Sequence, residues 1–118
     1  MRTILVIEDN IDALELLASW IRNVFKGFAH TACNVKEAVG ALEKHHFDII
    51  ICDYEMPDGT GADVLRYLRQ HQIMIPTILF SAHSDLSMEL ESPLSHVIRD
   101  KDYTKLFSIL KEFKEMPS

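Results

Sequence analysis

The sequence predicts an α/β fold, a doubly wound five-stranded parallel sheet with helices on both faces. Three observations predict it. Short, continuous apolar runs recur along the chain, which is typical of strands buried on both faces of a sheet. Segments with apolar residues at helical spacing separate these runs, and turn residues bound them. The chain has 118 residues, so we expect residues 1–118 to form a single domain.

The strands are expected where the apolar runs occur. They are residues 3–8, 28–32, 49–52, 77–80 and 96–99, of which 28–32 is the weakest. Parallel neighbours in such a sheet require a helical crossover between them. Doubly wound sheets of this size commonly take the flavodoxin-like strand order 2-1-3-4-5, which is adopted here from known folds.

The helices are expected between the strands. They are residues 11–25, 35–45, a helix after Thr60, 84–92 and 102–115. The first has one apolar face, formed by Leu14, Leu17, Trp20, Ile21 and Val24. Gly27 marks its end, and Asn34 with Glu37 forms a capping pattern before the second helix. Pro93 stops the fourth helix.

Composition restricts the class of function. The formal net charge is −6 without a cluster of Lys and Arg, which disfavours direct binding to nucleic acid or to an anionic membrane. No segment reaches the roughly 18 apolar residues of a membrane span, and the N-terminal apolar run is too short for a signal peptide. Cys33 and Cys52 are far apart, which favours a reducing compartment. We therefore expect a cytoplasmic protein.

Polar residues follow four of the predicted strands. They are Glu8 with Asp9, Asp53, Ser81 and Lys101. Because the carboxyl ends of parallel strands meet at one edge, we expect these side chains to gather there. Strands 1 and 3 are neighbours about 4.8 Å apart, so their three carboxylates can share one ion. Oxygen ligands of this kind favour Mg²⁺, with Mn²⁺ also possible, over Zn²⁺.

This arrangement suits a carboxylate that accepts a phosphoryl group. Asp53 is central, and its carboxylate can attack phosphorus to form an acyl phosphate. The metal and Lys101 would neutralise charge on the equatorial oxygens, and Ser81 could donate its hydroxyl to one of them. The added negative charge would draw Ser81 and Lys101 inward, which predicts a switch.

Over essentially its whole length the chain resembles the receiver domains of two-component response regulators. The matching motifs are Val6-Ile7-Glu8-Asp9-Asn10, Asp53-Tyr54-Glu55-Met56-Pro57 with Gly61, Phe80-Ser81-Ala82, and Lys101. The motifs are specific only in combination. The resemblance implies that Asp53 is the phosphoacceptor and that the donor is a phosphohistidine of a sensor histidine kinase or phosphotransfer protein. It also implies a signalling module that catalyses only its own phosphorylation and dephosphorylation.

The resemblance also implies how a metal is held. Asp9 and Asp53 would bind Mg²⁺ directly, together with the backbone carbonyl of Glu55, and Glu8 would act largely through water. The family commonly signals through its helix 4–strand 5–helix 5 face, which makes that face a possible homodimer interface. The downstream protein target cannot be named from the sequence.

Two positions depart from the family pattern. Ser81 matches the switch hydroxyl and Lys101 the phosphate-pairing amine, but Asp102 follows that lysine where proline is usual. Ile98 occupies the switch position, which usually carries an aromatic residue. The stretch 84–95 is also short, so the output face is the least family-like part of the chain.

In receiver domains the positions of Glu55 and His83 border the path of attacking water, so the resemblance implies that these two residues tune the lifetime of the acyl phosphate. Three functions remain open. The leading one is a phosphorylatable receiver, either free-standing or part of a longer regulator. The second is a receiver-like interaction module that does not switch by phosphorylation, which Ile98 and Asp102 favour. The third, an aspartate-dependent phosphohydrolase, lacks the cap insertion needed to enclose a substrate.

Overall fold

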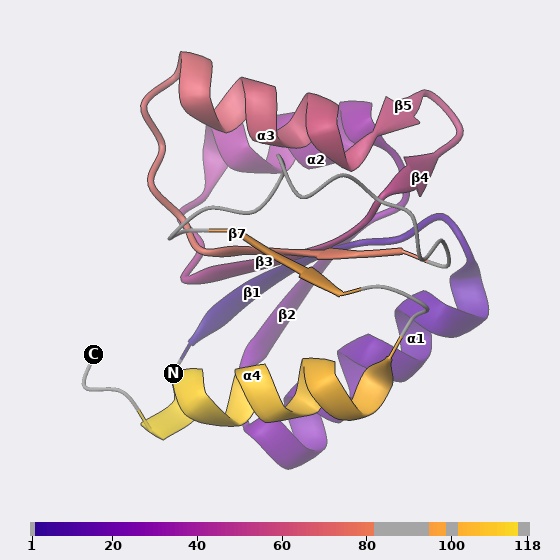
Figure 1. Ribbon diagram of the computed structural model, residues 1–118, viewed down its shortest axis with the longest axis vertical. Helices are drawn as coiled ribbons and strands as arrows, with labels where there is room; N and C mark the ends of the chain where they lie inside the picture. Colours follow the sequence, from indigo (N-terminus) through magenta and orange to yellow (C-terminus); the bar gives the residue numbers. More distant parts are fainter. Residues whose placement is uncertain (1, 82–94, 99–101, 116–118) are drawn as a thin grey trace.

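A five-stranded parallel sheet lies between two layers of helices (Figure 1). The computed structural model describes residues 2–81, 95–98 and 102–115. The strands of the sheet are β1 (Thr3–Ile7), β2 (Phe28–Ala32), β3 (Ile49–Asp53), β6 (Thr77–Phe80) and β7 (Ser95–Ile98). Their order is β2-β1-β3-β6-β7, which confirms the predicted order 2-1-3-4-5.

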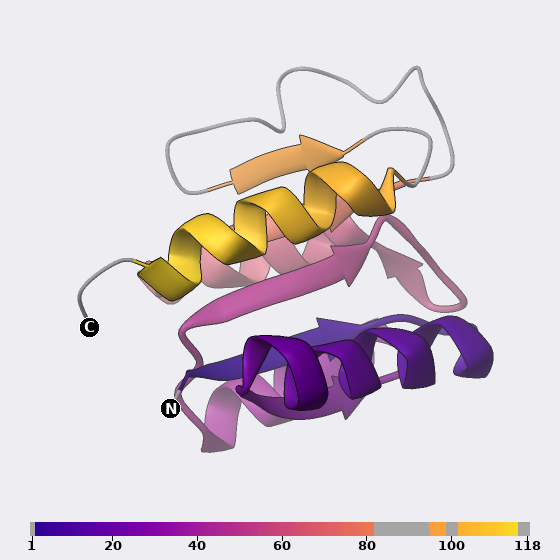
Figure 2. The ribbon, with the colours of Figure 1, turned by 90° about the horizontal axis from the view of Figure 1, so that it is seen from below.

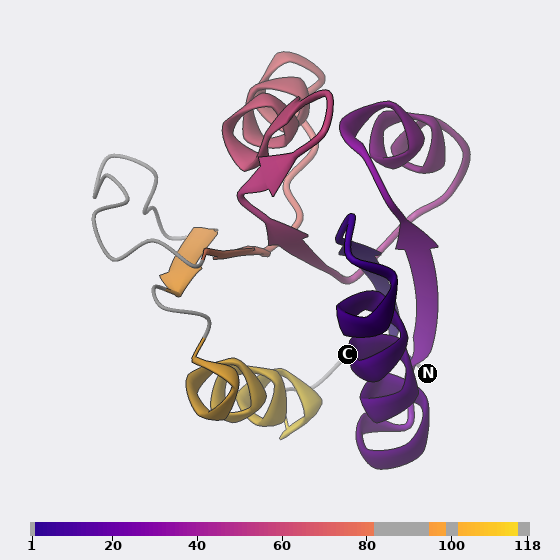
Figure 3. The same cartoon turned by 90° about the vertical axis from the view of Figure 1, so that its right-hand side faces the viewer.

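Helices cover both faces of the sheet, as predicted. On one side lie α1 (Ile11–Trp20), its continuation η1 (Ile21–Phe25) and α4 (Tyr103–Glu115). On the other side lie α2 (Val35–Lys44) and α3 (Gly61–Gln70), and the view along the sheet in Figure 3 separates the two layers. The helix predicted over 84–92 lies outside the described residues, as does the last residue of the strand predicted over 96–99.

Each face of the sheet has its own hydrophobic core because side chains of a strand alternate between faces. Ile4 and Val6 of β1 pack toward α1 and α4, whereas Leu5 and Ile7 pack toward α2 and α3. These side chains are at most 1% exposed, and burying one contributes about 1.5–3 kcal/mol. The continuous apolar runs in the sequence follow from burial on both sides.

The first helix differs from its prediction near its end. After Trp20 the backbone takes the wider π-helical turn of η1, and Lys26 closes it in the left-handed conformation with φ 61°. The wider turn moves Val24 off the apolar face, where it is 51% exposed, and places Phe25 in the core. The predicted buried position at Val24 is therefore wrong.

The two helices on this side contact each other through aromatic rings. Trp20 of α1 stacks on Phe107 of α4, with ring centroids 4.2 Å apart. Figure 2 shows α1 and α4 together in front of the sheet. The predicted packing role of Trp20 is thus confirmed. Among the described residues, no helix combines the length and the apolar character needed to cross a lipid bilayer.

Candidate functional site

Three carboxylates converge beyond the carboxyl ends of the two central strands. β1 and β3 are parallel neighbours, with Ile7 opposite Cys52, so the residues that follow them, Glu8 and Asp53, lie at the same level. One carboxylate oxygen from each of Glu8, Asp9 and Asp53 lies within 4.8 Å of the others. Glu8 and Asp53 are buried, whereas Asp9 is exposed. The site is therefore anchored inside the fold and open on one side.

Backbone hydrogen bonds hold these residues in place. The Glu8 N–H donates to the Ala32 carbonyl at 3.0 Å, which extends the pairing of β1 with β2 by one residue. The Asn10 N–H donates to Glu8 Oε1 at 3.4 Å, and Asn10 Oδ1 accepts from the Ala13 N–H at 3.0 Å. Asn10 thereby caps α1, which fixes Asp9 between a strand end and a helix start.

The residue after the next strand lies beside this group. Asp53 is opposite Phe80 in the register of β3 with β6, so Ser81 begins where that pairing ends. The Ser81 N–H donates to the Ile98 carbonyl at 3.0 Å, and both residues are buried. The structure therefore brings Ser81 and Ile98 to the same sheet edge as the carboxylates. Lys101 and His83, also predicted for the site, lie outside the described residues.

A short hairpin follows Asp53. It consists of β4 (Glu55–Met56) and β5 (Gly59–Thr60), paired antiparallel. The Gly61 N–H donates to the Tyr54 carbonyl at 2.7 Å and closes the loop beneath it. Met56 is buried in the core on the α2 side, while Glu55 is exposed. The hairpin thus carries Glu55 at an exposed position two residues after Asp53.

Asp58 at the tip of this hairpin caps α2, a role that the sequence did not predict. Its two carboxylate oxygens accept from the Val35 N–H at 2.8 Å and the Lys36 N–H at 3.0 Å. The bond from Val35 is the main cause that lowers the pKa of Asp58 below its ordinary value. The local pattern of Asp58 followed by Gly59 indicates only a turn, so it does not reveal the capping role of Asp58.

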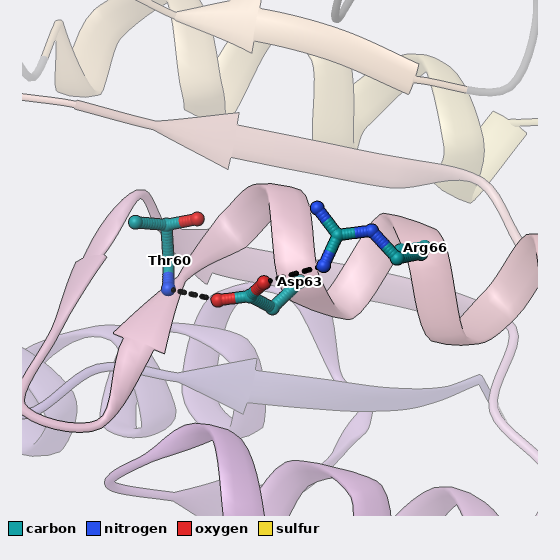
Figure 4. A network of polar contacts seen from close by, with 3 residues as sticks. All are labelled: Thr60, Asp63 and Arg66. Atoms are coloured by element: carbon teal, nitrogen blue, oxygen red, sulfur yellow. Dashed lines mark hydrogen bonds and ion pairs between the residues drawn. The ribbon is translucent and has the colours of Figure 1, made fainter.

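The other end of the hairpin is fixed to α3 by a capping box formed by Thr60 and Asp63. Asp63 Oδ2 accepts from the Thr60 N–H at 2.8 Å, and Asp63 Oδ1 accepts from Arg66 Nη1 at 2.9 Å (Figure 4). The bond from Thr60 is the main cause that lowers the pKa of Asp63. Asp58 and Asp63 therefore attach the two sides of the hairpin to two different helices.

Cys52 contributes no charge to the site. Its Sγ donates to the Asp53 carbonyl at 3.1 Å. Burial raises the pKa of the Cys52 thiol, and the nearby charges of Asp53 and Glu8 raise it further. The thiol stays protonated at neutral pH, and Cys52, at 0% exposed, packs as a small core residue.

The donor set fits a hard divalent cation. Glu8, Asp9 and Asp53 offer oxygen atoms only, which suits Mg²⁺ better than a metal that prefers imidazole or thiolate. Carboxylates this close repel one another unless a cation lies between them. The pocket therefore fits a phosphoacceptor site with Mg²⁺.

Comparisons with known proteins agree with this site. A family model described as "Response regulator receiver domain" matches residues 4–94. The response regulator protein PilR of Pseudomonas aeruginosa is 31% identical over 88 residues, which cover 75% of this chain and 20% of PilR. The transcriptional regulatory protein ZraR of Klebsiella oxytoca is 27% identical over 116 residues, covering 92% of this chain and 25% of ZraR. The chain thus spans about a quarter or less of these two relatives.

Solved structures show the same fold. The response regulator protein TrrA of Thermotoga maritima, in complex with Mg²⁺-BeF, matches with a TM-score of 0.79 and 28% identity, covering 95% of this chain and 98% of that one. The non-phosphorylated HemR receiver domain of Leptospira biflexa matches with a TM-score of 0.81 and 22% identity, covering 100% and 98%. The chain belongs to the response regulator receiver domain family of two-component signalling.

Proposed function

We propose that Asp53 accepts a phosphoryl group from the phosphohistidine of a sensor histidine kinase or phosphotransfer protein. An Asp53 carboxylate oxygen attacks phosphorus, the phosphorus–nitrogen bond of the donor breaks, and the imidazole takes up a proton as it leaves. The observation that carries this proposal is the approach of the Glu8, Asp9 and Asp53 carboxylates within 4.8 Å. The protein catalyses only its own phosphorylation and dephosphorylation.

Mg²⁺ is the proposed cofactor, and Mn²⁺ would suit the same ligands. Asp9 and Asp53 would hold the ion with their carboxylates and Glu55 with its backbone carbonyl, while Glu8 would act through water. When bound, the ion offsets the charge on the phosphoryl oxygens. The Mg²⁺-BeF complex of TrrA supports this choice, because it is a related chain of matching length.

Ser81 and Lys101 would respond to the new charge. Ser81 lies after the strand that pairs with the Asp53 strand, so its hydroxyl can donate to a phosphoryl oxygen there. Lys101 would pair with the same group. We propose that this change alters a protein-interaction face formed around β7 and α4. One outcome would be a homodimer through this face. We also propose that the protein is cytoplasmic. The net charge of −6 favours a protein partner over nucleic acid or membrane.

Intact-mass measurement tests the phosphoacceptor. Acetyl phosphate with Mg²⁺ should add one phosphoryl group, an increase of about 80 Da. Asp53→Asn should abolish the increase. Asp48→Asn is the matched control because Asp48 precedes the same strand at its opposite end, where it accepts from the Thr3 N–H. An adduct that forms equally on Asp53→Asn, or that forms without a divalent cation, would refute the proposal.

Glu55 and His83 are proposed to set the rate of dephosphorylation. Glu55 is exposed beside the acidic group, where its side chain can orient or exclude attacking water. The measurement is the decay of the phosphorylated mass in wild type, Glu55→Ala and His83→Ala. Identical half-lives in all three proteins would refute this role.

A second candidate is a receiver-like interaction module that does not switch by phosphorylation. The observation that favours it is Ile98, which is 0% exposed and aliphatic at the switch position. Titration with beryllofluoride and Mg²⁺, followed by NMR, separates the two candidates. Shifts that reach from Asp53 to β7 and α4 support switching, whereas shifts confined to the acidic group support the second candidate.

A further inference from the structure

A pair of histidines lies away from the acidic site, at the carboxyl end of α2. His30 is on the edge strand β2, and His45 is the residue that ends α2. Their ring centroids are 5.3 Å apart, with the ring planes at 47°. The sequence spacing of the histidines gave no sign of this pair, because the two residues are brought together only by packing of α2 on the sheet.

Both rings rest on one buried aromatic residue. Phe47 is 7% exposed, and the centroids of His30 and His45 lie 5.6 Å and 6.3 Å from its own, both in edge-on geometry. A ring packed against a fixed neighbour has fewer accessible rotamers, so the pair is partly organised before any ligand binds. His30 is half-buried and His45 is exposed, so an ion from solvent can reach them.

The pair borders a hollow of about 400 Å³ that has room for water ligands. Gly40 of α2 also borders it and contributes no side chain, and a Cβ there would meet nothing within 4 Å. Glu37 and Lys44 line the same hollow and carry opposite charges. Together they add no net positive charge that would repel a cation. The imidazoles are then the donors best suited to a metal in this hollow.

We propose that His30 and His45 bind a transition-metal ion of the zinc class, one nitrogen from each ring, with water completing the coordination. Imidazole is a preferred ligand of Zn²⁺ and Cu²⁺ and a poor one for Mg²⁺. A Zn²⁺–nitrogen bond of about 2.1 Å places the centre of each imidazole ring about 3.2 Å from the ion. If the two rings subtend a tetrahedral angle at the ion, their centres lie about 5.2 Å apart. The observed separation is 5.3 Å.

Such an ion would join the edge strand to the helix that covers it. Because the native state would bind it and the unfolded chain would not hold the two rings together, binding should raise the thermal stability. The proposal is independent of phosphorylation, since it uses neither Asp53 nor its neighbours.

The test is a Zn²⁺ titration of the full chain in excess Mg²⁺, which competes with Zn²⁺ for the carboxylates. Calorimetry should give one site, with NMR shifts at the His30 and His45 rings and a higher melting temperature. His30→Gln and His45→Gln should each lose at least about tenfold in affinity, since even changes outside the ligand shell cost that much. His71→Gln is the matched control, because His71 is exposed and packs on Tyr67 of α3.

The proposal is overturned if wild type shows no binding at millimolar Zn²⁺. It is equally overturned if His30→Gln and His45→Gln bind as tightly as wild type, which would place the ion elsewhere. Circular dichroism of each apo variant establishes that a lost site does not reflect a lost fold.

Discussion

Gly61 lies against both the hydrophobic core and the backbone of Asp53, and Gly61→Ala tests that contact. Gly61 is buried at the start of α3. A Cβ there would lie 2.6 Å from Leu79 Cδ2, 3.4 Å from Tyr54 Cα and 3.6 Å from the Asp53 carbonyl oxygen. Its φ is not positive, so backbone strain plays no part. The effect of the substitution is therefore steric.

The size of the effect follows from Leu79. Carbon atoms in contact lie about 3.5–4.0 Å apart, so the Leu79 methyl group must retreat by about 1 Å. Leu79 is 0% exposed, which leaves no space for that movement without displacing the core. Overpacking of this kind costs about 1–3 kcal/mol. At about 4 °C per kcal/mol for a chain of this size, the melting temperature should fall by about 4–12 °C.

Gly40→Ala is the matched control for thermal denaturation. Gly40 lies inside α2, and a Cβ there meets nothing within 4 Å. Alanine in an open helical position should stabilise by about 0.5–1 kcal/mol, an increase of about 2–4 °C. The two glycine substitutions should therefore move the melting temperature in opposite directions. A Gly61→Ala protein as stable as wild type would refute the steric argument.

A double-mutant cycle locates the clash. Leu79→Val removes the methyl group that the new Cβ would meet, at a cost of about 0.5–1.5 kcal/mol by itself. The double variant should be more stable than the sum of the two single effects by at least about 0.5 kcal/mol. Additive effects would place the clash elsewhere.

Three further predictions concern pH, thiol reactivity and the core. Folding lowers the pKa of Asp58 from 3.8, so the stability that Asp58 contributes is present above pH 3.8 and is lost as the pH falls through the lower pKa of the folded state. The stability of Asp58→Asn should therefore fall less steeply with acid than that of wild type. Equal stability–pH curves for the two proteins would contradict this. Glu37 accepts from Cys33 Sγ and raises the pKa of that thiol, so Glu37→Ala should speed alkylation of Cys33 at pH near 8, measured by mass spectrometry. Ile98→Tyr should lower the free energy of unfolding in urea by about 1–3 kcal/mol, since Ile98 is fully buried, and an unchanged value would contradict this.

The strand positions and the acidic residues could be predicted because they depend on local signals, whereas the strand order was adopted from known folds. A strand buried on both faces is a continuous apolar run, and Asp53 at the end of such a run is conspicuous. Once strands 1 and 3 are neighbours, Glu8, Asp9 and Asp53 must converge. The motifs of the receiver family then supplied the roles that spacing alone leaves open.

The features that the sequence did not reveal depend on contacts between distant residues. Asp58 bonds to residues 22 and 23 positions earlier, so no local pattern shows it. The approach of His30 to His45 also requires the packed position of α2. Val24 fits an ideal helical period, and only the π-helical turn, which propensities do not predict, turns it outward.

The two sides of Asp53 are held differently, which bears on where a phosphoryl group would act. On one side, the hairpin after Asp53 is bonded to α2 through Asp58 and to α3 through Asp63. On the other side, Ser81 is joined by a backbone hydrogen bond to Ile98 on the edge strand β7, which pairs only with β6 in the described sheet. A new charge at Asp53 would act on Ser81 and, through its backbone hydrogen bond, on Ile98 of β7. We therefore expect the response to travel toward β7 and α4, while the hairpin holds the backbone of Glu55, a proposed metal ligand, in place.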